Sequence, residues 1–390
     1  MQGSKRVQCS FGVLAVVVLL ACGGTDVGVS SDEIVIGTWA PLTGPASNLS
    51  TIARSMEAYF AYVNAEGGVN GRMLRLIIKN DGYDPSRTPE VVRELVEEDR
   101  IFAMLGGNGT ANCLAVKDYI TLRAVPWINP GSGVRVWTTP VIAYVFSTFP
   151  TYVTEGRVLT KYVVEELDAK KYGLLYQDGS FGREGQEGVR VGLRAVKGKE
   201  VALEQSYTVG DTDLSDVAQK FKDEEIDLIF VWTISEGAAA LVRAIDAIED
   251  YSPQIVGTQV LSDPIMFELV GESWDGAILA SSVPESTSDE PGVVRAREII
   301  EKYGPGIEFG TYAMWGLSRA EVLVEGMRRA GRELTRMQLI ASMETIKNWS
   351  DNSLGTPISF SRESHQGLNA VHIVKAEGGK LVHVSDWMQP

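Results

Sequence analysis

Histidine and cysteine are scarce in this sequence, which narrows the chemistry open to it. Only three of its 390 residues are histidines, and all of them lie within the last 26: His365, His372 and His383. No Cys-x-x-Cys or His-Glu-x-x-His spacing occurs. The sequence therefore predicts no metal site, and we interpret His372 as a strand residue that packs or faces solvent.

Catalytic and cofactor motifs are also missing. There is no Gly-x-Ser-x-Gly elbow, and the run Gly106-Gly107-Asn108-Gly109 lacks both the dinucleotide-binding spacing and a following Lys-Ser or Lys-Thr pair. Asp81 and Asp84 follow a predicted strand, where they form either a carboxylate dyad or, as we favour, turn and capping positions. We expect neither an enzyme nor a bound cofactor.

Positive charge is in short supply as well. The chain has 36 Lys and Arg against 51 Asp and Glu, a net charge of −15. Loss of an N-terminal signal with Lys5 and Arg6 would leave 34 against 51, or −17. Nucleic acids need a basic face, so we expect no nucleic-acid partner, and the folded part should not bind anionic lipid.

The first 22 residues have the pattern of a secretion signal. Lys5 and Arg6 precede a ten-residue apolar stretch, Phe11 to Leu20, which is short for a membrane-spanning helix. Ala21-Cys22-Gly23 then resembles a bacterial lipoprotein cleavage site, with lipid carried on Cys22; the alternative is an uncleaved anchor. We expect residues 23–32 to be a flexible tether. Cys9 leaves with the signal, so Cys113 remains without a disulfide partner.

The rest of the chain alternates strand and helix patterns about ten times. Apolar runs such as Ile34–Ala40 and Ile226–Trp232 predict strands, and stripes at offsets of three and four predict the helices between them. Alternation of this kind indicates an α/β fold with mainly parallel sheets. The 369 residues left after signal removal exceed one ordinary core, so we predict two similar lobes with a cleft between them.

Two small-residue loops are the strongest candidate for a binding site. Strand Ile101–Leu105 ends at Gly106–Gly109 before a helix that begins at Thr110, and strand Val125–Ile128 ends at Pro130–Gly133. In an open parallel sheet both loops lie at the carboxyl edge, where such sheets bind ligands. The helix start at Thr110 adds free N–H groups that suit a carboxylate or another acceptor-rich group.

Several segments resemble one family across residues 33–390. They are GTWAPLTGP from Gly37, NAEGGVNG from Asn64, DGYDP from Asp81, NPGS from Asn129 and YAMWGLSRAEVLVEGMRRAG from Tyr312. Together they are similar to the type I periplasmic solute-binding proteins of ABC transporters, the leucine/isoleucine/valine-binding kind.

The resemblance implies two Rossmann-like lobes that close on a ligand about a hinge crossed three times by the chain. We place the crossings near 147–150, 281–284 and 357–360. Residues 33–148 with 283–357 would form the N-terminal lobe, and 149–282 with 358–390 the C-terminal lobe. Ligand would bias this two-state hinge through contacts made only on closure.

The resemblance also assigns candidate ligand contacts in the first lobe. Thr110 matches a carboxylate-binding hydroxyl, with Asn108 and Gly109 beside it. Ser132 and Gly131 belong to the second loop, and Gly133 stands where the amino-acid binders have a threonine.

Across the cleft, Gln259 stands where the family has an acid for the ligand's ammonium group, and Ser235 is near the position of an expected tyrosine. Glu236, Asp178 and Asp263 are alternative ammonium partners. Phe181 keeps an aromatic position, and with Trp39, Trp127 and Trp232 it lines an apolar pocket or belongs to the ordinary core. We therefore expect an organic acid, an amide or an aromatic compound rather than a simple branched-chain amino acid.

The predicted function is an extracytoplasmic lipid-anchored solute-binding protein. It would sit at the cell surface or in the periplasm, act as a monomer and deliver a small molecule to ABC permease subunits. One alternative is a sensory module that presents the same ligand to a kinase or chemoreceptor. Another is an enzyme on a related α/β scaffold, against which the missing nucleophile and cofactor motifs count.

Overall fold

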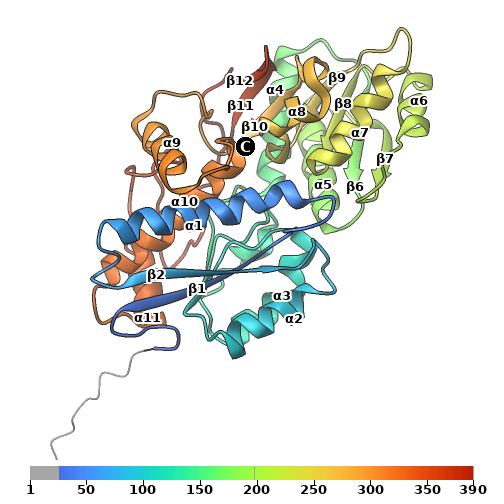
Figure 1. Cartoon of the computed structure of the whole chain (residues 1–390). Coiled ribbons are helices and arrows are strands. Elements are labelled where there is room, and N and C mark those ends of the chain that lie inside the picture. Colours follow the sequence, from blue (N-terminus) through green and yellow to red (C-terminus); the bar gives the residue numbers. More distant parts are fainter. Residues whose placement is uncertain (1–25, 197, 390) are drawn as a thin grey trace, which may run out of the picture.

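The computed structural model describes residues 26–196 and 198–389, which fold around two separate β-sheets. Figure 1 shows elements of the first sheet at the lower left and those of the second at the upper right. The predicted signal and Cys22 lie outside the described residues. Among the residues described, no helix is both long enough and apolar enough to cross a bilayer.

The first sheet contains five parallel strands in the order β2-β1-β3-β4-β5. Every residue of β3 and β4 is buried, as expected for strands covered on both faces. The strands are β1 (Glu33–Ala40), β2 (Met73–Asn80), β3 (Ala103–Leu105), β4 (Trp127–Ile128) and β5 (Val145–Phe146).

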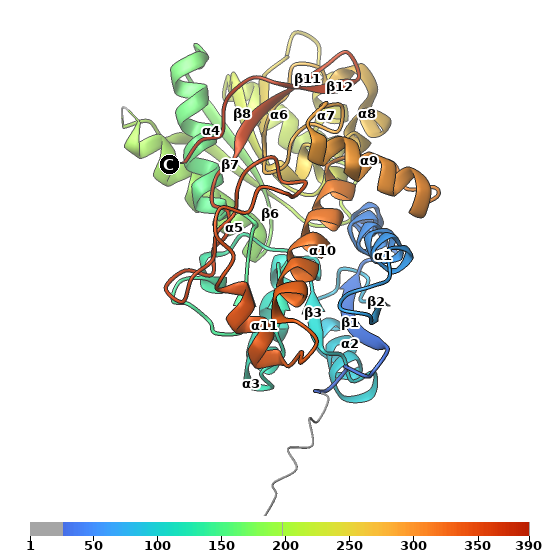
Figure 2. The ribbon, with the colours of Figure 1, turned by 90° about the vertical axis from the view of Figure 1, so that its left-hand side faces the viewer.

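Helices from both ends of the chain pack on this sheet. A methyl group at Gly316 of α10 would lie 2.3 Å from the Ile52 carbonyl oxygen of α1, so glycine there lets the two helices pack closely. Figure 2 shows α10 running beside α1 toward α11. These helices are α1 (Ser50–Ala65), α2 (Thr88–Arg93), α3 (Thr110–Leu122), α9 (Pro291–Tyr303), α10 (Thr311–Ala330) and α11 (Arg336–Met343).

The second sheet has seven strands in the order β12-β11-β10-β9-β8-β6-β7. Strands β6 to β10 are parallel, whereas β11 and β12 form an antiparallel hairpin on its edge. The strands are β6 (Tyr172–Gln177), β7 (Val201–Tyr207), β8 (Leu228–Trp232), β9 (Gln254–Gly257), β10 (Ile278–Ser281), β11 (His372–Glu377) and β12 (Lys380–His383).

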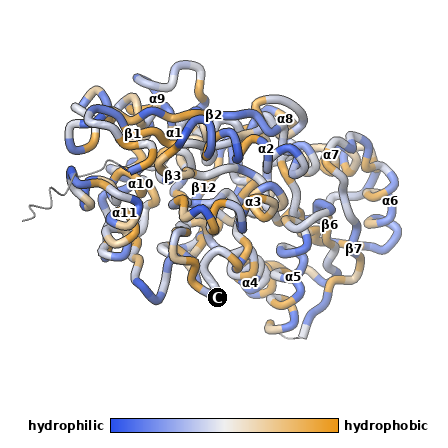
Figure 3. Tube along the Cα trace, turned by 90° about the horizontal axis from the view of Figure 1, so that it is seen from below, coloured by the Kyte–Doolittle hydropathy of each residue, from blue (hydrophilic) through white to orange (hydrophobic). Residues whose placement is uncertain are grey.

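Helices of the second lobe connect these strands. Figure 3 shows hydrophilic segments at the periphery, for example along α6, whose sequence SDVAQKFKD buries only two residues. The helices are α4 (Tyr152–Glu166), α5 (Ser180–Ala195), α6 (Ser215–Asp223), α7 (Ser235–Asp246) and α8 (Ile265–Val270). Single 3-10 turns lie at Ser47–Leu49, Arg135–Trp137, Gln259–Leu261 and Gly271–Trp274, and a π-helical turn at Glu94–Glu98 follows α2.

The predicted α/β fold with two mainly parallel sheets is confirmed. The chain passes from the first sheet to the second between β5 and α4, returns after β10, and passes over again between α11 and β11. Two of these passages lie side by side, because Ser147 pairs with Gln366 in a parallel bridge. Ser147 N–H also donates to the His365 carbonyl oxygen at 2.9 Å.

The structure corrects the prediction of a flexible tether over residues 23–32, of which 26–32 are described. Val29 is buried and bridges Ile34, and the Val35 N–H donates to the Gly28 carbonyl oxygen at 2.8 Å. Asp26 accepts from the Arg336 N–H at 2.7 Å. The composition is small and polar, but one apolar side chain and these hydrogen bonds dock the segment on the first lobe.

Candidate ligand-binding site

A narrow cavity of about 40 Å³ lies between the carboxyl edges of the two sheets. Loops after β3 and β4 form one wall, residues after β8 and β9 form the opposite wall, and α10 closes one end. The lining residues are Leu49, Ile52, Tyr83, Asn108, Gly109, Thr110, Gly131, Phe149, Tyr152, Phe181, Ile234, Val260, Trp315 and Arg319. Five predicted contacts, Asn108, Gly109, Thr110, Gly131 and Phe181, are among them.

The two predicted loops lie against each other at the floor of this cavity. Asn108 and Gly131 form a parallel bridge, and the Gly131 N–H donates to the Gly107 carbonyl oxygen at 2.9 Å. Helix α3 begins at Thr110 without a side-chain cap. Its first N–H groups therefore have no partner within the helix, and of these residues Thr110 lines the cavity.

Three hydroxyl groups join the loops to the second lobe. Ser132 Oγ donates to Thr110 Oγ1 at 3.0 Å, and Thr110 Oγ1 lies 3.2 Å from the hydroxyl of Tyr152 on α4. Burial raises the pKa of the Tyr152 hydroxyl, which stays protonated at neutral pH. Ser132 thus supports Thr110 from beneath and does not itself line the cavity, and the sequence analysis did not identify Tyr152.

Gly133 lies against the same tyrosine. A methyl group at this position would lie 2.6 Å from the Pro150 carbonyl oxygen and 2.8 Å from the Tyr152 ring. A threonine, as in the amino-acid binders, would not fit without a shift of backbone or ring. The Tyr152 side chain fills that space and brings its hydroxyl to Thr110.

Arg319 is the charged group of the cavity, and the sequence analysis did not identify it either. Its side chain is 3% exposed on α10. Its one hydrogen bond within the described chain is long, 3.4 Å from Nη1 to Asn108 Oδ1, and it makes no ion pair there. Asn108 is held in place by its Nδ2, which donates to the Leu49 carbonyl oxygen at 3.1 Å. Burial lowers the pKa of Arg319 to about 10, so the group is charged at neutral pH.

Aromatic rings form the apolar part of the cavity. The guanidinium carbon of Arg319 lies 5.9 Å from the centre of the Phe149 ring and 6.0 Å from that of Trp315. Phe181 from α5 packs on Tyr152, with ring centres 5.2 Å apart. These contacts place one cation at the edge of an aromatic pocket.

The polar residues predicted for the opposite wall do not line the cavity, and Gln259 and Ser235 bond to other side chains. Gln259 is fully buried, and its N–H and Nε2 donate to the two carboxylate oxygens of Glu155 at 2.6 and 2.9 Å. Burial raises the pKa of Glu155 to about 7. Ser235 Oγ lies 2.8 Å from the Tyr312 hydroxyl. Glu236 is partly buried, with one carboxylate oxygen unpaired in the described chain, and does not line the cavity.

The two alternative acids are also engaged. Asp178 pairs with Arg183 on the surface at 3.0 Å. Asp263 accepts from the Tyr312 N–H, at the start of α10, at 2.8 Å. Among the residues described, the cavity lining therefore holds one cation and no carboxylate.

The predicted tryptophans support the loops from behind. Trp39 Nε1 donates to the Asn108 carbonyl oxygen at 3.2 Å, and Trp127 Nε1 donates to that of Gly106 at 2.8 Å. Both rings and Trp232 are almost fully buried and do not line the cavity. Asp81 is likewise a turn residue, because its carboxylate accepts from the Tyr83 N–H and the Thr88 hydroxyl.

The chain matches a known protein family over most of its length. Residues 33–380 match the family described as periplasmic binding protein. A Leu/Ile/Val-binding protein homolog 2 from Brucella abortus is 24% identical over 315 residues, which cover 80% of this chain and 82% of that protein.

Two solved structures share the fold. A fatty acid ABC transporter substrate-binding protein from Thermomonospora curvata has a TM-score of 0.84 at 22% identity, covering 94% of this chain and 95% of its own. A branched-chain amino acid ABC transporter structure from Thermus thermophilus with bound valine also has a TM-score of 0.84, at 20% identity, covering 93% and 98%. The chain therefore belongs to the periplasmic binding protein family, as a type I solute-binding protein of the leucine/isoleucine/valine-binding kind.

Proposed function

We propose that this chain is the extracytoplasmic, lipid-anchored solute-binding protein of an ABC importer and that its ligand is a small organic carboxylate with an apolar or aromatic body. The observation that carries the proposal is Arg319, a buried cation in the cavity that no carboxylate of the described chain neutralises. The transport role is inferred from the family, and the ligand class is inferred from the residues that line the cavity.

A carboxylate suits the polar end of the cavity. Arg319 presents a planar fork of donors, which matches a carboxylate in a bidentate pair. The N–H groups at the start of α3 and the hydroxyl of Thr110 lie on the same cavity wall as the Asn108 side chain that contacts Arg319. Burial of the Arg319 charge away from water is unfavourable, and a bound anion would offset that cost.

An ordinary amino acid suits the cavity less well. Its ammonium group needs an acid or several acceptors when it leaves water. The lining holds no carboxylate in the described chain, and Gln259 is turned away toward Glu155. The rings of Phe149, Phe181 and Trp315 instead offer an apolar surface for the ligand's body.

Binding would stabilise the closed arrangement of the lobes. Thr110 and Arg319 belong to elements packed with the first sheet, whereas Phe181 and Ile234 belong to elements of the second. A ligand that contacts both groups lowers the free energy of the closed form more than that of an open form. A permease that recognises the closed form would then receive loaded protein.

A thermal-shift screen with matched compounds tests the ligand class. We would compare 3-phenylpropionate with its amide and with phenylalanine, and 4-methylpentanoate with its amide and with leucine. Each carboxylate should raise the melting temperature by mass action, while its amide and its amino acid have little effect. Leucine or phenylalanine as the ligand with the largest shift would refute the carboxylate proposal.

The membrane anchor needs a separate experiment. Cells expressing the full chain would be labelled with a fatty acid and fractionated. Wild type should carry label and remain with membranes, whereas Cys22→Ser should lose the label. An unlabelled wild type would refute lipidation and leave the ligand proposal intact.

A further inference from the structure

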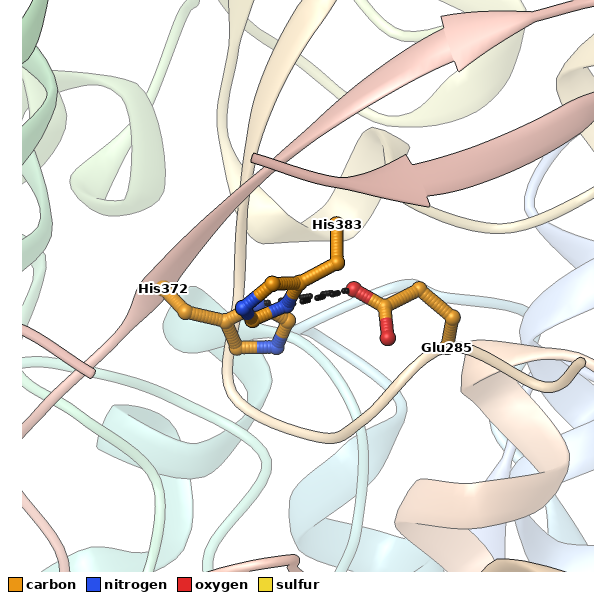
Figure 4. A group of neighbouring side chains, drawn as sticks. All are labelled: Glu285, His372 and His383. Atoms are coloured by element: carbon orange, nitrogen blue, oxygen red, sulfur yellow. Dashed lines mark hydrogen bonds and ion pairs between the residues drawn. The ribbon is translucent and has the colours of Figure 1, made fainter. Parts of the chain in front are cut away.

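Three potential metal ligands meet at the edge of the second sheet, away from the cavity. Glu285 follows β10 on the segment that leads back to the first lobe, His372 begins β11, and His383 ends β12. Figure 4 shows both imidazoles beside the Glu285 carboxylate. The hairpin brings the histidines together, since their ring centres are 5.0 Å apart.

The hydrogen bonds of His372 fix which ring nitrogen faces the carboxylate. Nε2 lies 2.8 Å from the Val283 carbonyl oxygen, which can only accept, so Nε2 carries the proton. In the neutral ring Nδ1 is then a bare acceptor. It is buried, has no hydrogen-bond partner in the described chain, and lies 3.7 Å from Glu285 Oε1. A metal ion between these two acceptors would satisfy both, as a proton or a bridging water molecule would.

His383 completes the arrangement from the solvent side. Its Nδ1 lies 3.0 Å from the same Glu285 oxygen, and its side chain is 49% exposed. The His372 side chain, by contrast, is 1% exposed. The cluster therefore has a fixed inner ligand and an outer one that an ion from solution can reach.

We propose that Glu285 Oε1, His372 Nδ1 and His383 Nδ1 bind a divalent transition-metal ion, with Zn²⁺ as the best match. Each of the three residues offers one potential ligand atom, and these atoms all lie within 4.8 Å of one another. Tetrahedral zinc bonds of about 2.0–2.1 Å put ligand atoms roughly 3.3 Å apart, and the two oxygen–nitrogen distances of 3.0 and 3.7 Å bracket that value. Two imidazoles and one carboxylate form a ligand set that zinc commonly takes, with water in the fourth position.

The neighbouring contacts resemble the outer shell of known zinc sites. A metal-bound histidine usually donates its second ring N–H to a carbonyl or carboxylate, which orients the ring. Val283 does this for His372. Because Glu285 lies on the segment that leaves β10, the ion would also fasten that segment to the β11–β12 hairpin of the second lobe.

Sequence spacing does not reveal this cluster. The two histidines are separated by a hairpin turn, and Glu285 lies far upstream of both. The antiparallel register, in which Ser281 pairs with His372 and Val374 with His383, brings the three together.

Titration calorimetry with zinc tests the proposal on tag-free protein that has been stripped with a chelator. Wild type should bind about one equivalent of Zn²⁺, which also raises its melting temperature. His383→Ala removes the exposed ligand and should weaken zinc affinity by more than the roughly 10- to 100-fold typical of outer-shell changes. Glu285→Gln should weaken it as well.

Glu377→Gln is the matched control, because Glu377 is an exposed carboxylate on the same hairpin. It should bind zinc like wild type. Co²⁺ in place of Zn²⁺ should give the visible absorption of a tetrahedral site in wild type and in the control, but not in His383→Ala. Absence of zinc binding by wild type, or equal binding by His383→Ala, would refute the site.

Discussion

Replacing Arg319 by methionine should weaken ligand binding without lowering the stability of the ligand-free protein. Loss of one partner of a buried, hydrogen-bonded ion pair costs about 3–5 kcal/mol. At about 1.4 kcal/mol per factor of ten, the affinity for a carboxylate should fall by roughly two to four orders of magnitude. Methionine keeps most of the side-chain volume, so the cavity wall stays filled.

The ligand-free protein should not lose stability through this change. The fall in the pKa of Arg319 from 12.5 to about 10 corresponds to about 3 kcal/mol against the charged form, at about 1.4 kcal/mol per pKa unit. Methionine removes that cost. It also removes the long hydrogen bond to Asn108 and the contacts with two aromatic rings, which are worth about 1–2 kcal/mol. The unfolding free energy without ligand should therefore stay level or rise slightly.

Calorimetry of 3-phenylpropionate binding and urea unfolding of the ligand-free protein measure the two effects. Arg319→Lys keeps the charge without the planar fork and should lie between wild type and Arg319→Met. Arg329→Met is the control on the same helix, because Arg329 pairs with Glu325 outside the cavity. It should leave binding unchanged. Unchanged carboxylate affinity in Arg319→Met, or a large loss of its ligand-free stability, would refute the reasoning.

Other substitutions test the surroundings of the cavity. Thr110→Val should weaken carboxylate binding by about 1–3 kcal/mol and also lower the ligand-free melting temperature, because Ser132 and Tyr152 both lose a partner; binding equal to wild type in calorimetry would contradict a ligand role. Burial raises the pKa of Glu155 from 4.5 to about 7, so the folded protein retains this proton to a higher pH than the unfolded chain does. Its contribution to stability is fully present below about pH 4.5 and is lost as the pH rises through about 7, a change of about 3 kcal/mol. In urea unfolding at several pH values, Glu155→Gln should lose most of this decrease in stability with rising pH. A pH profile equal to that of wild type would contradict the raised pKa of Glu155. Gly133→Ala should lower the unfolding free energy by about 1–3 kcal/mol, since its methyl group meets backbone and ring atoms; an unaffected urea midpoint would show that the tyrosine moves aside.

The fold could be predicted from the sequence because buried parallel strands have a strong local signal. Residues 228–232 form a continuous apolar run, and β8 (Leu228–Trp232) is buried at every position. The prediction of strands from apolar runs fails where one end of a short run belongs to the turn after a helix. Val125 was predicted to begin a strand, yet its N–H donates to the Ile120 carbonyl oxygen and ends α3, so that β4 contains only Trp127 and Ile128.

The loop residues of the candidate site could be predicted from the arrangement of parallel strands. Arg319 could not be predicted in this way. Loops after neighbouring parallel strands must meet at one edge, which placed Asn108, Thr110 and Gly131 together. Arg319 comes from a helix far along the chain, and no local pattern says which side of that helix faces the cleft. A signal was nevertheless present in the sequence, because apolar residues flank Arg319 at Leu317, at Ala320 and from Val322 to Val324. An arginine in such surroundings indicates a buried charge that needs a partner.

The glycine at position 133 shows why residue-by-residue transfer from a family misleads at such a site. The resemblance presented Gly133 as the loss of a hydroxyl. In the structure the missing side chain leaves room for Tyr152, whose hydroxyl reaches Thr110 at 3.2 Å. A hydroxyl is thus supplied from α4 instead of from the loop, and a bulky ring comes with it. The Tyr152 ring packs on Phe181 and Trp232. Tyr152 therefore supplies a hydroxyl to Thr110 and also adds an aromatic ring to the wall formed by the second lobe. Gly133 and Tyr152 therefore act as one unit, and together with Arg319 they support the proposed ligand, an anion with an apolar body.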